Sequence, residues 1–288
     1  MNALKNVTAL ARPLDPRYPS NVLIMLLTVA IGAAIFIERL IGGETFSEAI
    51  ISAASGALAA FLAWALNREI DPDREESANG AAIITVLLMF LLGIDPALLA
   101  LFLLLMAARV INLITGVHVH PADMLLLALL TGLTATTDFW VAGLAGVLAF
   151  LLDQRTASPH PRGLLYAGLL LIVWAVGLFG WGDPDLLIAL ISLWGWLVLG
   201  TIFLVSRYVI PGFPDPLASL TDFTQRPVDR QRIVFANILL ALILALEVWR
   251  LGEAGAAGLA PLWAAFISVV GYNLGDIFSG KHPTRTNL

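Results

Sequence analysis

Apolar residues occur in long continuous runs along most of this chain. Three of these runs read LIMLLTVAIGAAIFI, LLALFLLLMAA and ILLALILALEV. They lack the alternation of apolar and polar residues that marks the strands of a membrane β-barrel. Because hydrocarbon offers no hydrogen bonds to a backbone, continuous apolar segments of this kind cross a bilayer as helices. The pattern therefore predicts an all-α, polytopic integral membrane helix bundle.

The apolar runs divide the chain into ten segments of roughly helical length. We expect them near residues 21–37, 49–66, 79–94, 97–114, 121–137, 139–152, 163–180, 186–206, 233–249 and 257–275. Ten crossings joined by short connections make five consecutive hairpins. Residues 1–20 are then a cytoplasmic amino-terminal segment, residues 21–275 the transmembrane bundle, and residues 276–288 a cytoplasmic tail.

Composition agrees with a lipid-embedded chain. Of the 288 residues, 59% are hydrophobic and 13% charged, whereas about a quarter of a soluble domain is charged. Residues 1–20 contain no uninterrupted apolar core, so we expect the first apolar run to be a retained span and not a cleaved secretory signal. Cysteine is absent, which excludes disulfides, thiol catalysis and cysteine-based metal centres.

The basic residues fix an expected orientation. With the amino terminus in the cytoplasm, only Arg39 and Arg250 of the 16 basic residues fall outside. The others fall inside: Lys5, Arg12, Arg17, Arg68, Arg74, Arg109, Arg155, Arg162, Arg207, Arg226, Arg230, Arg232, Lys281 and Arg285. This distribution follows the positive-inside rule. We therefore expect both termini in the cytoplasm, and the protein in the cytoplasmic (inner) membrane with the lipid bilayer as its surroundings.

Residues 121–152 allow two interpretations. They hold two apolar segments that are each shorter than the roughly 20 residues that cross a bilayer. A re-entrant hairpin that enters and leaves from the cytoplasm would carry the same flanking charges. Gly132, Gly143 and Gly146 suit the break in such a hairpin, and they equally suit close packing between two full spans. The sequence leaves both interpretations open.

Polar residues near the predicted inner helix ends are the candidate substrate ligands. Arg109 and Asn112 lie one helical turn apart and share a face, where they would grip an anionic group. Asn237, Asn273 and Asp276 lie on the last two predicted spans and complete the candidate set. A positive-inside anchor and ordinary hydrogen bonding at helix ends are the alternative interpretations.

The densest polar cluster is NREIDPDREES, after the second predicted span. Asn67, Asp71 and Asp73 are candidate Mg²⁺ ligands there, because oxygen ligands beside a membrane hold Mg²⁺ and so present a diphosphate. The spacing of Asn67 and Asp71 resembles the start of the acidic motif in membrane prenyltransferases of the UbiA superfamily. Arg68 stands where that motif has its first Asp, and the resemblance covers fewer than ten residues. The alternative is a solvated loop whose Arg68 and Arg74 pair with neighbouring acids.

No catalytic or nucleotide-binding motif occurs in the sequence, and no basic patch with interleaved aromatic residues indicates nucleic-acid binding. A small-molecule transporter or permease is the leading interpretation, because a bundle with minimal loops leaves its interior for function. One alternative is a membrane-embedded enzyme that acts on a lipid or isoprenoid at the cytoplasmic face. The other is an accessory subunit, within a homo-oligomer or beside a membrane partner. Only the enzyme implies a cofactor, which is Mg²⁺.

The predicted orientation is testable with tags on two connections. A tag beside Asp183 lies in an outer turn, and a tag beside Arg155 lies in an inner loop. Membrane-impermeant reagents added to intact cells should therefore label the first tag and not the second, because the bilayer blocks access to the inner loop. Labelling of the Arg155 tag alone would mean that the topology is inverted.

Overall fold

The structure is a computed structural model of the 288-residue chain. It describes residues 8–12, 14–92, 96–182, 193–210, 213–214 and 216–278. Throughout these residues the secondary structure is helical, with one isolated bridge between Leu220 and Pro227 and no strand. The predicted all-α class is therefore confirmed for the described chain.

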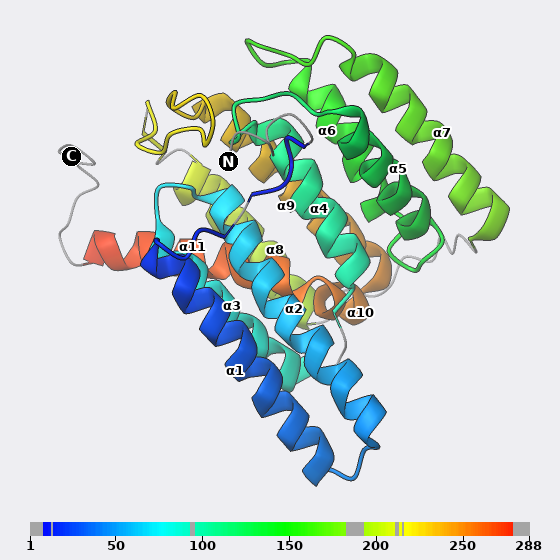
Figure 1. The fold of residues 1–288 in the computed structure, drawn as a ribbon, viewed down its shortest axis with the longest axis vertical. Coiled ribbons are helices and arrows are strands. Elements are labelled where there is room, and N and C mark those ends of the chain that lie inside the picture. The colour runs from blue at the N-terminus through cyan, green and yellow to red at the C-terminus, as the bar shows by residue number, and fades with distance from the viewer. Residues whose placement is uncertain are drawn as a thin grey trace.

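Thirteen helical elements follow one another through the described chain (Figure 1). They are α1 (Pro19–Ile41), α2 (Phe46–Ile70), α3 (Glu75–Leu92), α4 (Leu98–Asn112), α5 (Pro121–Ala135), η2 (Ala142–Leu144), α6 (Ala145–Asp153), α7 (Gly163–Trp181), α8 (Leu193–Leu204), η3 (Val205–Val209), α9 (Arg230–Leu251), α10 (Glu253–Gly258) and α11 (Ala260–Phe278). Four of them, α1, α2, α7 and α9, are long and apolar enough to cross a membrane.

The remaining apolar helices are shorter, and two predicted spans differ from the helices observed. The last predicted span, 257–275, corresponds to α11 (Ala260–Phe278), and its first residues fall at the end of a separate short helix, α10, which ends at Gly258. Part of the predicted span 186–206 lies outside the described residues, which resume at Leu193 in α8. By length and composition, four helices are thus suited to cross a membrane, and the shorter helices pack against them and against one another.

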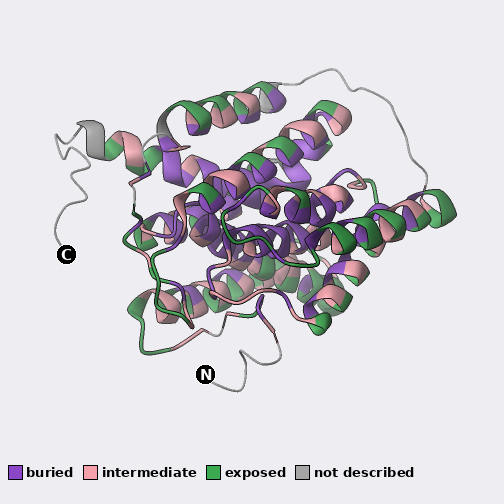
Figure 2. Ribbon diagram, turned by 90° about the horizontal axis from the view of Figure 1, so that it is seen from above, coloured by how far each residue is buried: buried purple, intermediate pink, exposed green. Residues whose placement is uncertain are grey.

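The helices form two groups that share a buried middle. Figure 1 shows α1 and α2 as a long hairpin on one side and α5, α6 and α7 together on the other, with α4 between them. Contacts between helices agree, since α2 packs on α1, α3, α4 and α11, and α4 also packs on α5, α6 and α9. Eleven of the 15 residues of α4 are buried. Buried residues gather in the middle of the bundle (Figure 2).

Large apolar side chains cover much of the outer surface. On α1, Val29 is 72% exposed and Ile41 is 82% exposed, and on α7 the rings of Phe179 and Trp181 are about equally open. Soluble monomers rarely expose so much contiguous apolar surface. These side chains have the character expected of groups that face lipid.

Contacts with α9 show how far along the bundle the α5–α6 hairpin reaches. The sequence leaves the depth of this hairpin open. Near the start of α9, Arg232 forms a buried 2.8 Å ion pair with Asp153 at the end of α6. Near its end, a carboxylate oxygen of Glu247 accepts a 2.9 Å hydrogen bond from the backbone N–H of Ala142. The two contacts are about 22 Å apart along α9. The η2–α6 limb of the hairpin therefore extends beside α9 for most of the length of a helix that is long enough to cross a membrane.

Glycines allow this hairpin to approach α7 closely. A Cβ at Gly177 would lie 2.7 Å from the carbonyl oxygen of Gly132, and a Cβ at Gly143 would lie 2.8 Å from the Trp174 ring. Small residues at such crossings let helix backbones approach where side chains would separate them. Close packing, one of the two predicted roles for these glycines, is what the structure shows.

Replacement of Gly177 by Ala should destabilise the α5–α7 contact. The added methyl group meets a backbone oxygen that cannot move without shifting a helix, at a cost of about 1–3 kcal/mol. Gly168→Ala is the matched control, because Gly168 lies on the same helix and a Cβ there meets nothing within 4 Å. In thermal unfolding of the detergent-solubilised protein, the midpoint temperature should be lower for G177A than for the unmodified protein. The midpoint for G168A should not change. Equal midpoints for the two variants would contradict the close contact.

Candidate functional site

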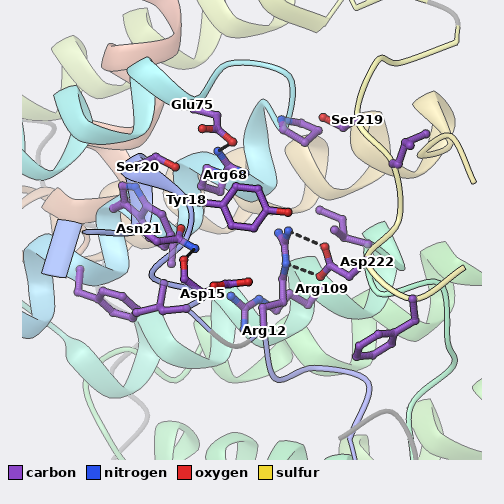
Figure 3. Close-up of a pocket in the computed structure, with 18 of the residues that line it drawn as sticks. Arg12, Asp15, Tyr18, Ser20, Asn21, Arg68, Glu75, Arg109, Ser219 and Asp222 are labelled. Carbon is purple, nitrogen blue, oxygen red and sulfur yellow. Dashed lines mark hydrogen bonds and ion pairs between the residues drawn. The ribbon is translucent and has the colours of Figure 1, made fainter. Parts of the chain in front are cut away.

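A cavity of about 400 Å³ opens at the end of the bundle where α2 and α4 finish and α1 begins. We call this the basic end. The cavity is bounded by the N-terminal strap (residues 8–12 and 14–18), the last two turns of α2, the end of α4, and the loop that precedes α9 (Figure 3). Charged, polar and aromatic side chains line it together. A cavity of this volume is within the range that holds small ligands.

The N-terminal strap is bound to the ends of the helices over which it passes. The backbone N–H of Ala9 donates to the Asp123 carboxylate (2.8 Å), and the backbone oxygen of Ala9 accepts from the Thr115 hydroxyl (2.9 Å). The guanidinium of Arg109 donates to the backbone oxygen of Leu10 (2.7 Å). Leu10 itself is buried. The strap is therefore an integral wall of the cavity.

Glu69 on α2 is the centre of a buried charge network. Its side chain is fully buried and accepts 3.0 Å hydrogen bonds from Arg109 Nε and from Asn112 Nδ2. The guanidinium of Arg12 lies 3.7 Å from the same carboxylate. A buried carboxylate is stable only when it is paired and hydrogen-bonded, and removal of one partner typically costs about 3–5 kcal/mol. Glu69 thus ties α2, α4 and the strap together.

Arg12 extends this network to the loop before α9. Its Nε and Nη2 donate to the two carboxylate oxygens of Asp222, at 2.8 and 3.0 Å. Burial lowers the pKa of Arg12, but the charges of Glu69 and Asp222 outweigh that effect, so the pKa is raised and the guanidinium stays charged. A bidentate pair of this kind fixes both distance and orientation.

The loop before α9 is held over the cavity by three other connections. The carboxylate of Asp73 accepts from the backbone N–H groups of Ala218 and Ser219, and the backbone N–H of Asp222 donates to the carbonyl of Ile114. Leu113 ends α4 in the left-handed conformation (φ 50°), which turns the chain toward this contact. The loop and the strap therefore close the cavity from one side.

Aromatic rings and a second ion pair complete the cavity wall. The rings of Phe61 and Trp64 are stacked on α2 with their centroids 5.8 Å apart. Trp64 is largely buried, and its indole nitrogen has no hydrogen-bond partner among the described residues. Arg68 Nη1 lies 2.9 Å from a carboxylate oxygen of Glu75 at the rim. The cavity thus combines an apolar wall with ionic groups.

The predicted substrate ligands separate into those at the cavity and those away from it. Arg109 lines the cavity. Asn112 lies behind the wall, where it donates to the Glu69 carboxylate that Arg109 also binds. Asn237 is buried and donates to the backbone oxygens of Ile70 and Ile233, which connects α9 to the end of α2. Asn273 donates to Val269 within its own helix. The side chain of Asp276 lies outside the described residues.

The predicted Mg²⁺ ligands each have other contacts. Asn67 donates to the carbonyl of Ala265 and accepts from the Ser77 hydroxyl, and Asp71 lies 3.7 Å from Arg74. Asp73 holds the loop before α9, as described above. Across the described part of the chain, no three His, Cys, Asp or Glu side chains are close enough to hold a metal ion together. The expected pairs of Arg68 and Arg74 with neighbouring acids are both present.

Three residues of the site were not singled out by the sequence patterns, namely Glu69, Arg12 and Asp222. Glu69 stands within the acidic cluster, but nothing in the local sequence distinguishes it from the other acids there. Arg12 and Asp222 are separated by 210 positions, so no spacing rule connects them. Of the three, only Arg12 carried a feature that could have identified it from sequence, namely a positive charge just before the first predicted span.

Searches of protein-family models, of curated proteins and of solved structures found no match for this chain. The fold and the site therefore define its class. It is an all-helical protein with apolar helices suited to a membrane, and it has a mixed polar and aromatic cavity at its basic end.

Substitution of Asp222 by Asn should loosen the N-terminal strap. The change removes the charge that holds Arg12, and a hydrogen bond to a charged group contributes about 1.5–3 kcal/mol. Amide hydrogen exchange in residues 8–12 should therefore become about tenfold faster or more. Asp229→Asn is the control, because Asp229 lies in the same loop and its side chain caps α9 through Gln231. Strap exchange that is unchanged in D222N would show that the ion pair does not hold it.

Proposed function

We propose that this protein is a multi-pass transporter of small molecules in the cytoplasmic membrane, with the cavity at the basic end as its substrate site on the cytoplasmic side. The observation that carries the proposal is the cavity itself, enclosed between helix ends, the N-terminal strap and the loop before α9. A site at one end of an apolar helix bundle has the position that a carrier needs to take up a solute from one side of the membrane.

The proposal includes ten crossings in five hairpins, with both termini in the cytoplasm. Contacts at the basic end support this arrangement, because they join segments that the charge pattern places inside: the strap, the α2–α3 turn, the α4–α5 loop and the loop before α9. Contacts at the opposite end join the α3–α4 connection to the end of α10, through Ala97 and Gly258, and the α5–α6 connection to the last turns of α9, through Ala142 and Glu247. The reach of the α5–α6 hairpin along α9 favours two crossings over a re-entrant loop.

The parts that close the cavity differ in a way that suits alternating access. On the basic side the closing parts are a strap and a loop, joined by the single bidentate pair of Arg12 and Asp222. Toward the middle of the bundle the closing parts are tightly packed helices, including α4 and the alanine-rich face of α2. Opening of the first closure requires only that one ion pair and a few hydrogen bonds break.

The two other functions each have one favouring observation. An enzyme acting on a lipid or isoprenoid is favoured by the acidic residues beside the cavity, including Asp71 and Asp73, with Mg²⁺ as the implied cofactor. An accessory role, with a second copy or another membrane subunit as partner, is favoured by an apolar groove between α5 and α7 that contains Gly132 and Gly177. The transporter accounts for the cavity without a cofactor or a partner.

Solute flux into proteoliposomes tests the transporter directly. Vesicles with purified protein are incubated with a radiolabelled panel of amino acids, organic acids, organic cations and nucleosides, without divalent cations. At least one class should enter faster than in protein-free vesicles, and Trp64→Ala should slow that flux because it removes the wall of the cavity. Ile41→Ala, at an exposed position at the other end, is the control. A panel that never exceeds the protein-free rate would reject transport of these classes, and activity that requires Mg²⁺ would favour the enzyme.

A further inference from the structure

The charges around the cavity do not balance. Three arginines line it, Arg12, Arg68 and Arg109, and each has a carboxylate partner: Asp222, Glu75 and Glu69 in turn. Asp15 is a further carboxylate that lines the cavity, besides Glu75 and Asp222. One of its oxygens accepts from the backbone N–H of Arg17, and no ion pair to it is formed by the described residues. Among the residues that line the cavity and their ion-pair partners, four carboxylates therefore accompany three guanidinium groups.

Aromatic side chains line the same cavity as this additional carboxylate. Tyr18, Phe61, Trp64 and Phe223 all line the cavity with Asp15. In Figure 3, Asp15 and Tyr18 border the same space as Arg12, Arg109 and Asp222. The faces of aromatic rings attract cations, with energies of about 0.5–2 kcal/mol that increase as water is removed. The rings also provide an apolar surface for the uncharged part of a ligand.

We propose that the cavity binds a small organic cation with a single positive charge and an apolar or aromatic portion. Its ammonium group is placed beside Asp15 and the rings, and its apolar portion lies against Phe61 and Trp64. An anion would meet arginines whose charges are already neutralised, together with the free charge of Asp15. This inference rests on the proposed function for its setting, but it concerns binding and is tested by binding.

Equilibrium dialysis with three probes of similar size measures the charge preference. The probes are benzyltrimethylammonium, phenylacetate and phenylalanine, which are a cation, an anion and a zwitterion. The full-length protein in nanodiscs should bind the cation saturably and most tightly. Asp15→Asn should weaken cation binding by about tenfold or more, since it removes a full charge at short range. Asp138→Asn, an exposed position at the opposite end, should change nothing. Tighter binding of phenylacetate, or no effect of D15N, would overturn the proposal.

The ion pair of Arg68 and Glu75 at the rim provides a second test, in which the two variants should shift binding in opposite directions. Misfolding would weaken binding in both variants. Arg68→Gln frees the charge of Glu75 and should strengthen cation binding, whereas Glu75→Gln frees Arg68 and should weaken it and admit phenylacetate. Both positions are partly exposed, so both variants are expected to fold. Each shift should be about three- to tenfold, as expected for one partly solvated charge. Shifts in the same direction for both variants would overturn the charge argument.

Two further comparisons are needed. The first distinguishes a lipid head group from a free solute as the natural cation, and the second distinguishes failure of this inference from failure of the proposed function. If benzyltrimethylammonium binds in phosphatidylglycerol nanodiscs and is displaced in phosphatidylcholine nanodiscs, the natural cation is a lipid head group. Binding in both identifies a free solute. Cation binding without flux would reject the transporter and leave this inference intact. Flux of other solutes with no charge preference in binding would reject the inference and leave the transporter intact.

Discussion

The buried carboxylate of Glu69 determines how the basic end of the bundle is built. A charge with no access to water must be neutralised and hydrogen-bonded within the protein. Arg109 and Asn112 satisfy it from α4, and Arg12 approaches it from the N-terminal strap. Because Arg12 also holds Asp222, one carboxylate on α2 organises the strap, α4 and the loop before α9. The cavity exists because these segments meet there without filling the space between them.

The helices could be predicted because lipid imposes a single requirement on them. Apolar segments and basic flanks mark α1, α2, α7 and α9 well, since length and composition alone decide that these helices can cross a membrane. The break between α10 and α11 was not predictable in the same way. The residues of α10 and α11 are apolar on both sides of Leu259, so composition does not show where one helix ends.

The site was predicted only where its residues are close in sequence. Arg109 and Asn112 share a helical face, and the structure brings both to one carboxylate. Asn237 and Asn273 are likewise polar residues in apolar segments, but their side chains donate to backbone carbonyls of helices. The sequence alone does not distinguish this structural role from ligand binding. The pair of Arg12 and Asp222 depends on the whole fold, because its partners meet only after the intervening helices have packed.

The N-terminal strap also sets an order of assembly. Its residues are synthesised before the helices that they join, and its partners Asp123 and Asp222 follow more than one hundred residues later. The strap therefore has nothing to dock against until those partners have been made, and the basic end stays open until the loop before α9 is complete. Closure of that end must then follow the synthesis of most of the bundle, although one of the two closing segments is made before any of its helices.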